Sequence, residues 1–479
     1  MVGRCVHVVA MVVAACLAPA AWANEPGDSA AHADQVASGH NSAIPYPAGL
    51  KTQVEFWKRV FATYSTHQVA IHDTLYLDRT YEVLDFGTLA DSGLSDAEIA
   101  AYAREKVESE KERIRALLMR LHRQGDDPQT LTFEEQKIAA LFAESTDPAK
   151  YLHAAADDRL RTQTGLRERF AAGVEISRRY LPAMEATFRR AGLPLELTRL
   201  PLVESCFNVR AYSKVGAAGI WQFMPSTGRL FMRIDRAVDE RRDPIASTEA
   251  AADFLKANYD VLGTWPLAIT AYNHGRAGMV RAVADVGSND IVEIIQHYHG
   301  PAFKFASRNF YAEFLAAVEV ERNFESYFGP LSPQKPLRTD KVAVPDTISL
   351  RTLARAVDAD TDTLAEFNPA LTREVISGRL PVPRGYTLHL PPGSAGRFRV
   401  HYASLAAAEK AKIQLAMAHR KSRARVQKAA YVTHRVQRGQ TLATIAKKYR
   451  TSVGAIRTRN RLHTNPRLRA GQSLIIPTT

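Results

Sequence analysis

The chain has 479 residues, of which 46% are hydrophobic and 24% charged, and its formal net charge is +13 at pH 7. This length and apolar content exclude a fibrous or disordered chain and predict two or more globular domains of about 100 to 200 residues each. Beyond the first 23 residues the sequence contains a single cysteine, Cys206, which excludes an internal disulfide in that part of the chain.

The N-terminus has the features of an export signal. Arg4 provides a positive charge, residues 6–18 are mostly apolar, and Ala21-Trp22-Ala23 forms a small-x-small cleavage site. We therefore expect residues 1–23 to be a secretory signal peptide. The alternative is that Val13-Ala14-Ala15-Cys16 is a lipobox, in which case Cys16 would carry a lipid anchor. No later stretch reaches the ~18 apolar residues that a membrane span requires.

Two segments without a chemical motif follow. Residues 24–48 are rich in small and polar side chains and end in Pro45-Tyr46-Pro47, which predicts a disordered spacer. Residues 49–190 show a helical pattern, with apolar positions recurring among dense charges over 99–121. We expect a helical N-terminal region there.

A glutamate in an apolar segment is the first candidate for chemistry. Glu204 lies in the run LPLVESCF, residues 200–207. Cleavage of a glycosidic bond needs an acid that protonates the leaving oxygen. Desolvation in this apolar segment would raise the pKa of Glu204 and keep its carboxyl protonated. An isolated glutamate is more often a surface residue, so the assignment depends on the motifs that follow.

Two further motifs lie downstream, GAAGIWQFMP over residues 216–225 and AYNHG over residues 271–275. The glycines of the first motif permit a tight turn close to a saccharide, and Gln222 can present an amide to sugar hydroxyls. Tyr272 and Asn273 can donate hydrogen bonds near the glutamate. The structural alternatives are a turn with an exposed Gln222, and a buried tyrosine followed by a capping asparagine. Between the motifs, Asp243-Pro244 predicts a helix start.

These motifs, with Glu204-Ser205 first, resemble in order and spacing the catalytic domain of lytic transglycosylases. The resemblance implies a mainly α protein whose residues 191–330 form a lysozyme-like α-helical catalytic domain. It implies that Glu204 is the catalytic residue and that substrate is bound by Ser213, Gln222, Tyr272 and Asn273.

The segment SRNFYAEF, residues 307–314, departs from the family pattern. Phe310 stands where many relatives have a site tyrosine, and Tyr311 follows one place later. We include Tyr311 among the expected substrate-binding residues, with the alternative that it does not reach the site.

The implied reaction cuts the β-1,4 bond between N-acetylmuramic acid and N-acetylglucosamine without water and leaves 1,6-anhydro-N-acetylmuramic acid ends. Such an enzyme is a carbon–oxygen lyase acting on a polysaccharide and needs neither cofactor nor metal. We interpret His274, His297 and His299 as surface or core histidines. The rival hypotheses are a lysozyme-type hydrolase that uses the same glutamate, and a non-catalytic scaffold that binds the cell wall.

The C-terminal part predicts two small modules. Residues 432–478 show the order strand, helix, helix, strand and resemble LysM, a module that binds peptidoglycan and chitin. Residues 340–393 resemble a degenerate LysM-like module, and residues 400–431 form a basic linker between the two. The candidate glycan-binding residues of the LysM module, for which packing or capping is the alternative, are Gly439, Gln440, Thr441, Asn460, Arg461 and Leu462.

The positive charge is concentrated at this end of the chain. Residues 401–479 contain 17 Lys or Arg against one acid, Glu409, so their net charge is +16 and that of the remaining residues is −3. In an exported protein this charge suits an anionic wall polymer or lipid, or is simply a solvated surface. Nucleic-acid binding does not fit the export signal.

The order of the segments resembles that of the same family, and this resemblance implies a periplasmic enzyme whose partner is the peptidoglycan glycan strand. If Cys16 is lipidated, the enzyme would also associate with the outer membrane. The sequence makes no prediction of the oligomeric state.

Overall fold

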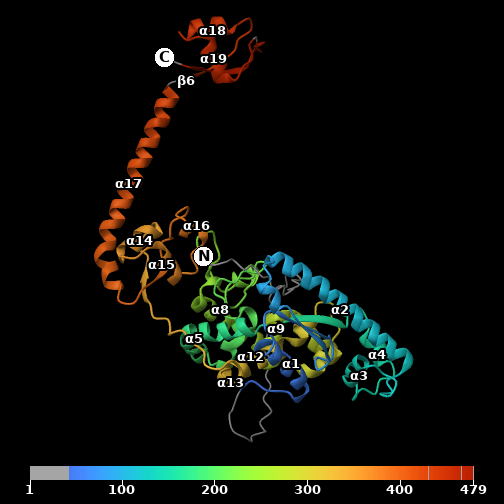
Figure 1. Ribbon diagram of the computed structural model, residues 1–479. Helices are drawn as coiled ribbons and strands as arrows, with labels where there is room; N and C mark the ends of the chain where they lie inside the picture. The colour runs from blue at the N-terminus through green and yellow to red at the C-terminus, as the bar shows by residue number, and fades with distance from the viewer. Residues whose placement is uncertain (1–42, 430, 465, 478–479) are drawn as a thin grey trace. The chain divides into compact units, whose positions relative to one another are not determined.

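The computed structural model describes residues 43–429, 431–464 and 466–477, in which helices predominate and the sheets are small (Figure 1). The expected signal peptide and Cys16 lie outside these residues. The chain divides into two compact units. The first comprises the described residues up to 339 together with 365–377, and the second comprises 340–364 and 378–477. Within the described residues, no helix is long and apolar enough to span a bilayer.

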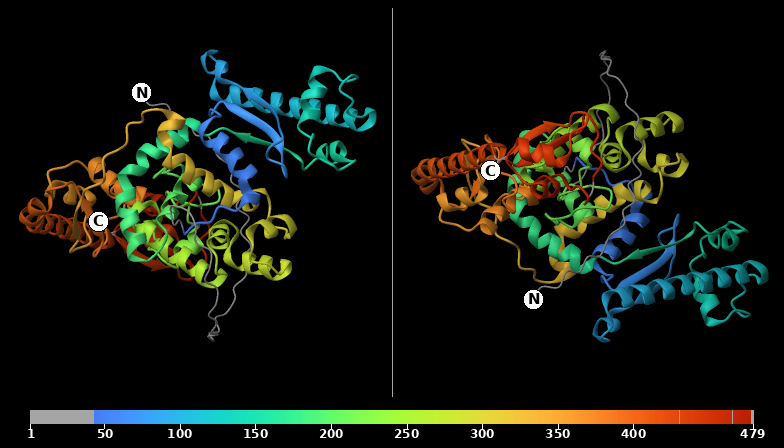
Figure 2. Two further views of the ribbon diagram at one scale, coloured as in Figure 1. Left: turned by 90° about the horizontal axis from the view of Figure 1, so that it is seen from below. Right: turned by 90° about the horizontal axis from the view of Figure 1, so that it is seen from above.

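A three-stranded antiparallel sheet opens the first unit. Strand β1 (Gln68–Asp73) lies between β2 (Thr80–Asp85) and β3 (Leu160–Thr164). Helix α2 (Asp96–Gln124) runs alongside this sheet (Figure 2), and α3 (Phe133–Ala140) and α4 (Lys150–Ala154) pack beside it. The shared core includes Ile71, Tyr81, Ile114, Leu118 and Phe142.

This sheet corrects the expectation that residues 49–190 are helical throughout. The segments QVAIHD and TYEVLD are short and rich in β-branched and aromatic residues, which favour strands. The third strand pairs with β1 across about ninety intervening residues, as in the pair Ala70 and Gln163. Such a long-range pairing has no signal in the local sequence pattern.

Most of the remaining helices of the first unit surround a second, larger core. It includes the fully buried Phe56, Phe188, Trp221 and Phe310. The helices and 3-10 turns are η1 (Ala48–Leu50), α1 (Lys51–Ala62), η2 (Gly87–Asp91), α5 (Arg167–Arg190), η3 (Leu195–Arg199), α6 (Leu200–Ser205), α7 (Pro225–Gly228), η4 (Glu240–Arg242), α8 (Pro244–Leu262), α9 (Trp265–His274), α10 (Arg276–Val286), α11 (Ile291–His297), α12 (Phe305–Arg322), α13 (Phe324–Phe328) and α16 (Arg373–Ile376).

The end of the expected spacer is packed against this core, which corrects the prediction of disorder for residues 43–48. Ile44 is 7% exposed and belongs to the large core, and the carbonyl of Pro45 accepts a hydrogen bond from the Tyr311 hydroxyl at 2.5 Å. Burial of one apolar side chain and one satisfied carbonyl holds the segment in place. Ordered structure therefore begins before η1.

The second unit contains two two-stranded sheets. In the first, β4 (Asp340–Ala343) pairs with β5 (Thr387–Leu390), and the intervening helices are α14 (Leu350–Ala356) and α15 (Thr361–Phe367). The linker predicted over 400–431 lies largely in the long helix α17 (Ala395–Ala429).

The terminal module follows the predicted strand, helix, helix, strand order. Its elements are β6 (Tyr431–Arg435), α18 (Leu442–Lys448), α19 (Val453–Asn460) and β7 (Ser473–Pro477). The amide of Asn460 bonds the backbone N–H and carbonyl of Ile475, each at 2.7 Å, and so fastens α19 to β7.

Candidate active site

Helix α6 carries Glu204 near its C-terminal end. Leu200 to Val203 are buried and anchor the helix in the large core. The helix ends abruptly because Cys206 and Phe207 both adopt left-handed backbone angles, with φ of 48° and 55°. Two consecutive non-glycine residues in this region are strained, and such strain persists where the surrounding structure enforces it. The glycine at position 173 of α5 leaves room for this backbone, since a Cβ there would lie 2.7 Å from the Cys206 carbonyl oxygen.

The environment of Glu204 favours its protonated form. The side chain is partly accessible, and within the described residues its carboxyl has no hydrogen bond or ion pair. Burial raises the pKa of Glu204 to about 8, and the nearby charge of Glu313 acts in the same direction. A carboxyl with this pKa retains its proton at neutral pH and can serve as a general acid.

The glycine-rich motif forms a compact turn. Gly216, Gly219 and Gln222 have φ angles of 91°, 75° and 47°. Only glycine fits at position 219, because a Cβ there would lie 1.8 Å from the Arg241 carbonyl oxygen. The turn is closed by a bridge between Ala218 and Phe223.

Arg241 of η4 stabilises the turn through hydrogen bonds to its carbonyl groups. The guanidinium is buried, pairs with Asp239 at 2.7 Å, and donates to the carbonyls of Gly216 at 2.7 Å and Phe223 at 3.0 Å. The fold therefore fixes the conformation of the turn through hydrogen bonds from a buried cation.

Hydrogen bonds bring the three motifs together. Ser205, next to Glu204, donates through Oγ to the carbonyl of Ile220 at 2.9 Å. Tyr272 of α9 donates through its hydroxyl to the carbonyl of Trp221 at 2.8 Å. Burial and the charge of Glu204 both raise the pKa of Tyr272, which places the tyrosine within electrostatic reach of the glutamate. Helix α6, the turn and α9 thus converge as the sequence motifs indicate.

The other polar candidates are half-buried and partly engaged. Gln222 donates through Nε2 to the Gly219 carbonyl at 2.8 Å, which leaves its amide oxygen without a partner among the described residues. Ser213 accepts from the Ala217 N–H through Oγ at 2.8 Å. Asn273 accepts from Ser307 of α12 at 3.0 Å. Each retains hydrogen-bonding capacity for a ligand.

Tyr311 lies apart from this group. Its side chain is 0% exposed, and its hydroxyl bonds the Pro45 carbonyl. Successive residues of a helix point about 100° apart, so a tyrosine displaced by one place faces another direction. The structure therefore supports the alternative that Tyr311 does not reach the site, since its side chain is buried in the core.

The structure adds a residue that the sequence reasoning missed, Glu313 on α12. It is 3% exposed, and its charge acts on Glu204. The signal available in the sequence was a carboxylate within the otherwise apolar stretch FYAEFLAA.

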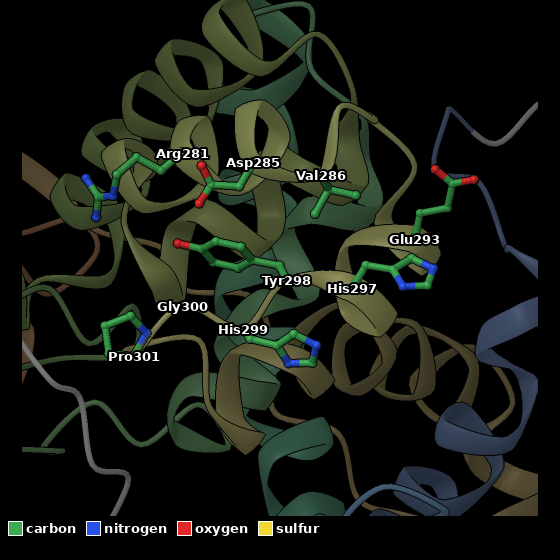
Figure 3. Close-up of a pocket in the computed structure, with 9 residues that line it drawn as sticks. All are labelled: Arg281, Asp285, Val286, Glu293, His297, Tyr298, His299, Gly300 and Pro301. Atoms are coloured by element: carbon green, nitrogen blue, oxygen red, sulfur yellow. The ribbon is translucent and has the colours of Figure 1, made fainter.

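A pocket of about 800 Å³ lies on the α10 and α11 side of the first unit (Figure 3). Its lining includes Arg281, His297, Tyr298 and His299 and none of the predicted catalytic or substrate-binding residues. The Tyr298 ring lies 6.4 Å from the ring of His274, which directly follows Asn273. In the part of the chain that the structure describes, no three His, Cys, Asp or Glu side chains group as metal ligands would.

The LysM candidates have structural contacts of their own. Thr441 caps α18, Asn460 fastens α19 to β7, and Gln440 bonds His434 at 2.7 Å. Gly439 and Arg461 have positive φ, at 82° and 53°. Leu462 packs against the small core of the module. The packing and capping roles considered from sequence are therefore present, and a glycan role stays a prediction.

Comparison with known proteins assigns domains to these regions. Residues 182–295 match the transglycosylase SLT domain, residues 434–477 the LysM domain, and residues 338–407 the LysM-like domain of lytic transglycosylase MltD. The chain is 28% identical over 302 residues to membrane-bound lytic murein transglycosylase D of Escherichia coli strain K12. That match covers 62% of this chain and 63% of the relative, which is under two thirds of its length.

Two solved structures are also similar. An inactive mutant of lytic transglycosylase Slt from Pseudomonas aeruginosa matches with a TM-score of 0.27 at 17% identity, covering 47% of this chain and 37% of that one. The 70 kDa soluble lytic transglycosylase from Escherichia coli matches with a TM-score of 0.26 at 17% identity, covering 44% and 34%. The chain thus combines a transglycosylase SLT domain with LysM-like and LysM domains and shows homology to membrane-bound lytic murein transglycosylase D of Escherichia coli.

Proposed function

We propose that this protein is a peptidoglycan lytic transglycosylase that leaves 1,6-anhydro-N-acetylmuramic acid ends and acts in cell-wall turnover or remodelling. The observation that carries the proposal is the buried position of the Glu204 carboxyl, which raises its pKa, together with the lack of a partner among the described side chains and the convergence of the three family motifs around it. A structural carboxylate would instead be paired or hydrogen-bonded.

Glu204 performs two proton transfers in the proposed reaction. Its carboxyl first protonates the glycosidic oxygen of the leaving N-acetylglucosamine, while the substrate's acetamido group stabilises the positive centre at C1 of the muramic acid. The Glu204 carboxylate then removes the proton of the C6 hydroxyl, whose oxygen bonds to C1 and closes the anhydro ring. The glutamate ends protonated again, so a single carboxyl completes the cycle.

The neighbouring motifs bind and orient the sugar. The free amide oxygen of Gln222 suits an acetamido N–H or a hydroxyl of the glycan. The Tyr272 hydroxyl fixes the Trp221 carbonyl and thereby the turn beside Glu204. We assign substrate binding to Gln222, Ser213, Tyr272 and Asn273. Tyr311 is not among them because it has no exposed surface.

The remaining segments supply location and tethering. We infer that residues 1–23 are a signal peptide that directs the chain to the periplasm. The alternative is that Cys16 is lipidated, in which case the protein would associate with the outer membrane. The LysM domain would keep the enzyme on glycan strands and raise the local substrate concentration.

The test is the chemistry of the product ends. Purified peptidoglycan is incubated with the protein, and the masses of the released muropeptides are measured by mass spectrometry with and without borohydride reduction. Anhydro ends, which lack one water and resist reduction, support the lyase. Reducible ends would assign a hydrolase, and no released muropeptide would assign a wall-binding scaffold.

A further inference from the structure

Residues 365–377 lie in the first unit, although the region that matches the LysM-like domain spans 338–407. They comprise the end of α15, the helix α16 and the loop that joins them. This loop, residues 368–372, has the sequence NPALT. It packs against residues 236–242, which lie within the match to the SLT domain and contain η4. One loop of the LysM-like region is thus part of the unit that holds the candidate active site.

The contact is a short antiparallel pairing between the two backbones. Leu371 and Val238 form a β-bridge, and both side chains are fully buried. Beside the bridge Thr372 donates twice, through its N–H to the Ala237 carbonyl at 3.0 Å and through Oγ1 to the Arg236 carbonyl at 2.8 Å. Buried apolar area and satisfied backbone groups hold a packed segment in place, so the loop is fixed on the SLT domain.

The paired residues lead directly to the glycine-rich turn. The Asp239 N–H donates to the Ala370 carbonyl at 2.8 Å, and the Asp239 carboxylate pairs with Arg241 at 2.7 Å. Arg241 in turn donates to the carbonyls of Gly216 and Phe223, at 2.7 Å and 3.0 Å. The loop therefore holds the backbone of the residue whose carboxylate orients the buried guanidinium.

The turn continues this series of contacts to Glu204. Ser205, the next residue along α6, donates through Oγ to the carbonyl of Ile220 in the turn at 2.9 Å. Gln222, a candidate for substrate binding, lies in the same turn with a φ of 47° that the surrounding structure must enforce. A shift of the buried ion pair would therefore be passed to the helix that carries the catalytic carboxyl and to a sugar-binding residue.

The terminal LysM module shows the same place in a related arrangement. There α19 is followed by residues 460–462, the candidate glycan-binding residues at this end of the helix, which are half-buried or exposed. In the LysM-like region α15 is followed by Asn368, Ala370 and Leu371, all of them buried. The equivalent loop is thus accessible in one module and covered in the other, which indicates that residues 368–372 serve a contact within the chain.

We propose that residues 368–372 are a positioning element for the cleavage reaction, which keeps the glycine-rich turn in its active geometry by holding the backbone of Asp239. The inference rests on the proposed function. Displacement of a substrate-orienting group by about 1 Å can cost about a hundredfold in rate, so a turn fixed from outside the SLT domain match affects catalysis directly. The LysM-like region acts here through the fold, because the buried Leu371 has no surface left for a glycan.

Thr372 allows the contact to be weakened step by step. Thr372→Pro deletes both donors, and the φ of −72° at this position is one that proline adopts. Thr372→Val keeps the shape and the N–H but deletes the hydroxyl donor, whereas Thr372→Ser keeps both donors. The matched control is Ser377→Ala, which deletes a hydroxyl in the same segment that donates to the Glu374 carbonyl instead.

The experiment measures anhydro-muropeptide release by the full chain as a function of peptidoglycan concentration, and urea unfolding shows that each variant is folded under the assay conditions. We expect Thr372→Pro to lower the maximal rate by about two- to thirtyfold, the range over which substitutions between coupled regions act, and to leave the half-saturating peptidoglycan concentration unchanged. Thr372→Val should show a smaller loss of maximal rate. Thr372→Ser and Ser377→Ala should match the unchanged protein.

The outcomes separate this proposal from the proposed function. Equal maximal rates for Thr372→Pro and the unchanged protein would overturn the positioning role. A change confined to the half-saturating concentration would also overturn it, because the loop would then bind substrate. So would an equal loss in Thr372→Ser and Thr372→Val, since the hydroxyl would not be the cause. If Thr372→Pro does not fold, an unchanged maximal rate in Thr372→Val is the contradicting result. Absence of cleavage by the unchanged protein would refute the proposed function, and the positioning role with it.

Discussion

Substitution of Gly219 by alanine should destabilise the protein by much more than the cost of placing an alanine at a positive φ angle. At φ of 75°, an alanine pays the left-handed strain of about 1 kcal/mol. Its Cβ would also lie 1.8 Å from the Arg241 carbonyl oxygen, whereas Cβ contacts under 3.0 Å essentially never occur, so the backbone must move by over an ångström. Forced overpacking costs about 1 to 3 kcal/mol more. The free energy of unfolding should therefore fall by about 3 kcal/mol.

Gly263 is the matched control. Its φ of 74° is nearly the same, but a Cβ there meets no atom within 4 Å. Gly263→Ala should cost only the strain of about 1 kcal/mol. Urea denaturation of both variants measures the difference. Equal losses in the two variants would refute the claim that contact with Arg241 dictates glycine at 219.

The remaining predictions concern charge, pH and the LysM domain. Arg241→Met leaves Asp239 buried without its partner and should lower the free energy of unfolding by about 3 to 5 kcal/mol, whereas Arg233→Met breaks an exposed pair with Asp235 and should cost less than about 1 kcal/mol in the same urea titration. Glu204 must be protonated to act as the acid, and its pKa is raised to about 8. The cleavage rate should therefore stay constant up to pH 7 and fall as pH rises through 8. A rate that already falls near pH 5 would mean that the carboxyl has the pKa of an ordinary exposed glutamate. Asn460→Ala removes the hydrogen bonds between α19 and β7 and should lower the free energy of unfolding of the LysM domain by about 2 kcal/mol. The expected readout is weaker co-sedimentation with peptidoglycan, and unchanged co-sedimentation would contradict this role.

Local patterns in the sequence predicted the parts of the structure that local chemistry determines. The helix start at Asp243-Pro244 is confirmed, since the Asp243 side chain accepts from the Ile245 and Ala246 N–H groups. The terminal βααβ order is confirmed because its turns and apolar positions are all encoded within 50 residues. The convergence of Glu204, the glycine-rich turn and Tyr272 was expected from the resemblance that the three motifs carry.

Features that depend on distant contacts were missed or misplaced. Strand β3 pairs with β1 from far along the chain, so the sheet in the N-terminal region had no local signature. The direction of the Tyr311 side chain depends on the rotation of α12 and on the Pro45 carbonyl, which lies 266 residues away. Glu313 looked like one more helical glutamate because its burial becomes visible only when α12 is packed.

The most direct test of the central claim is the activity of Glu204→Gln, measured as anhydro-muropeptide release from purified peptidoglycan alongside peptidoglycan binding and urea unfolding. Gln has nearly the same shape and no ionisable proton, so we predict that cleavage is abolished while binding is retained. Stability at pH 8 should be no lower than that of the unchanged protein, because a buried carboxyl with a raised pKa opposes folding as it ionises. Release of anhydro ends by Glu204→Gln at the rate of the unchanged protein would contradict the assignment of Glu204 as the catalytic acid.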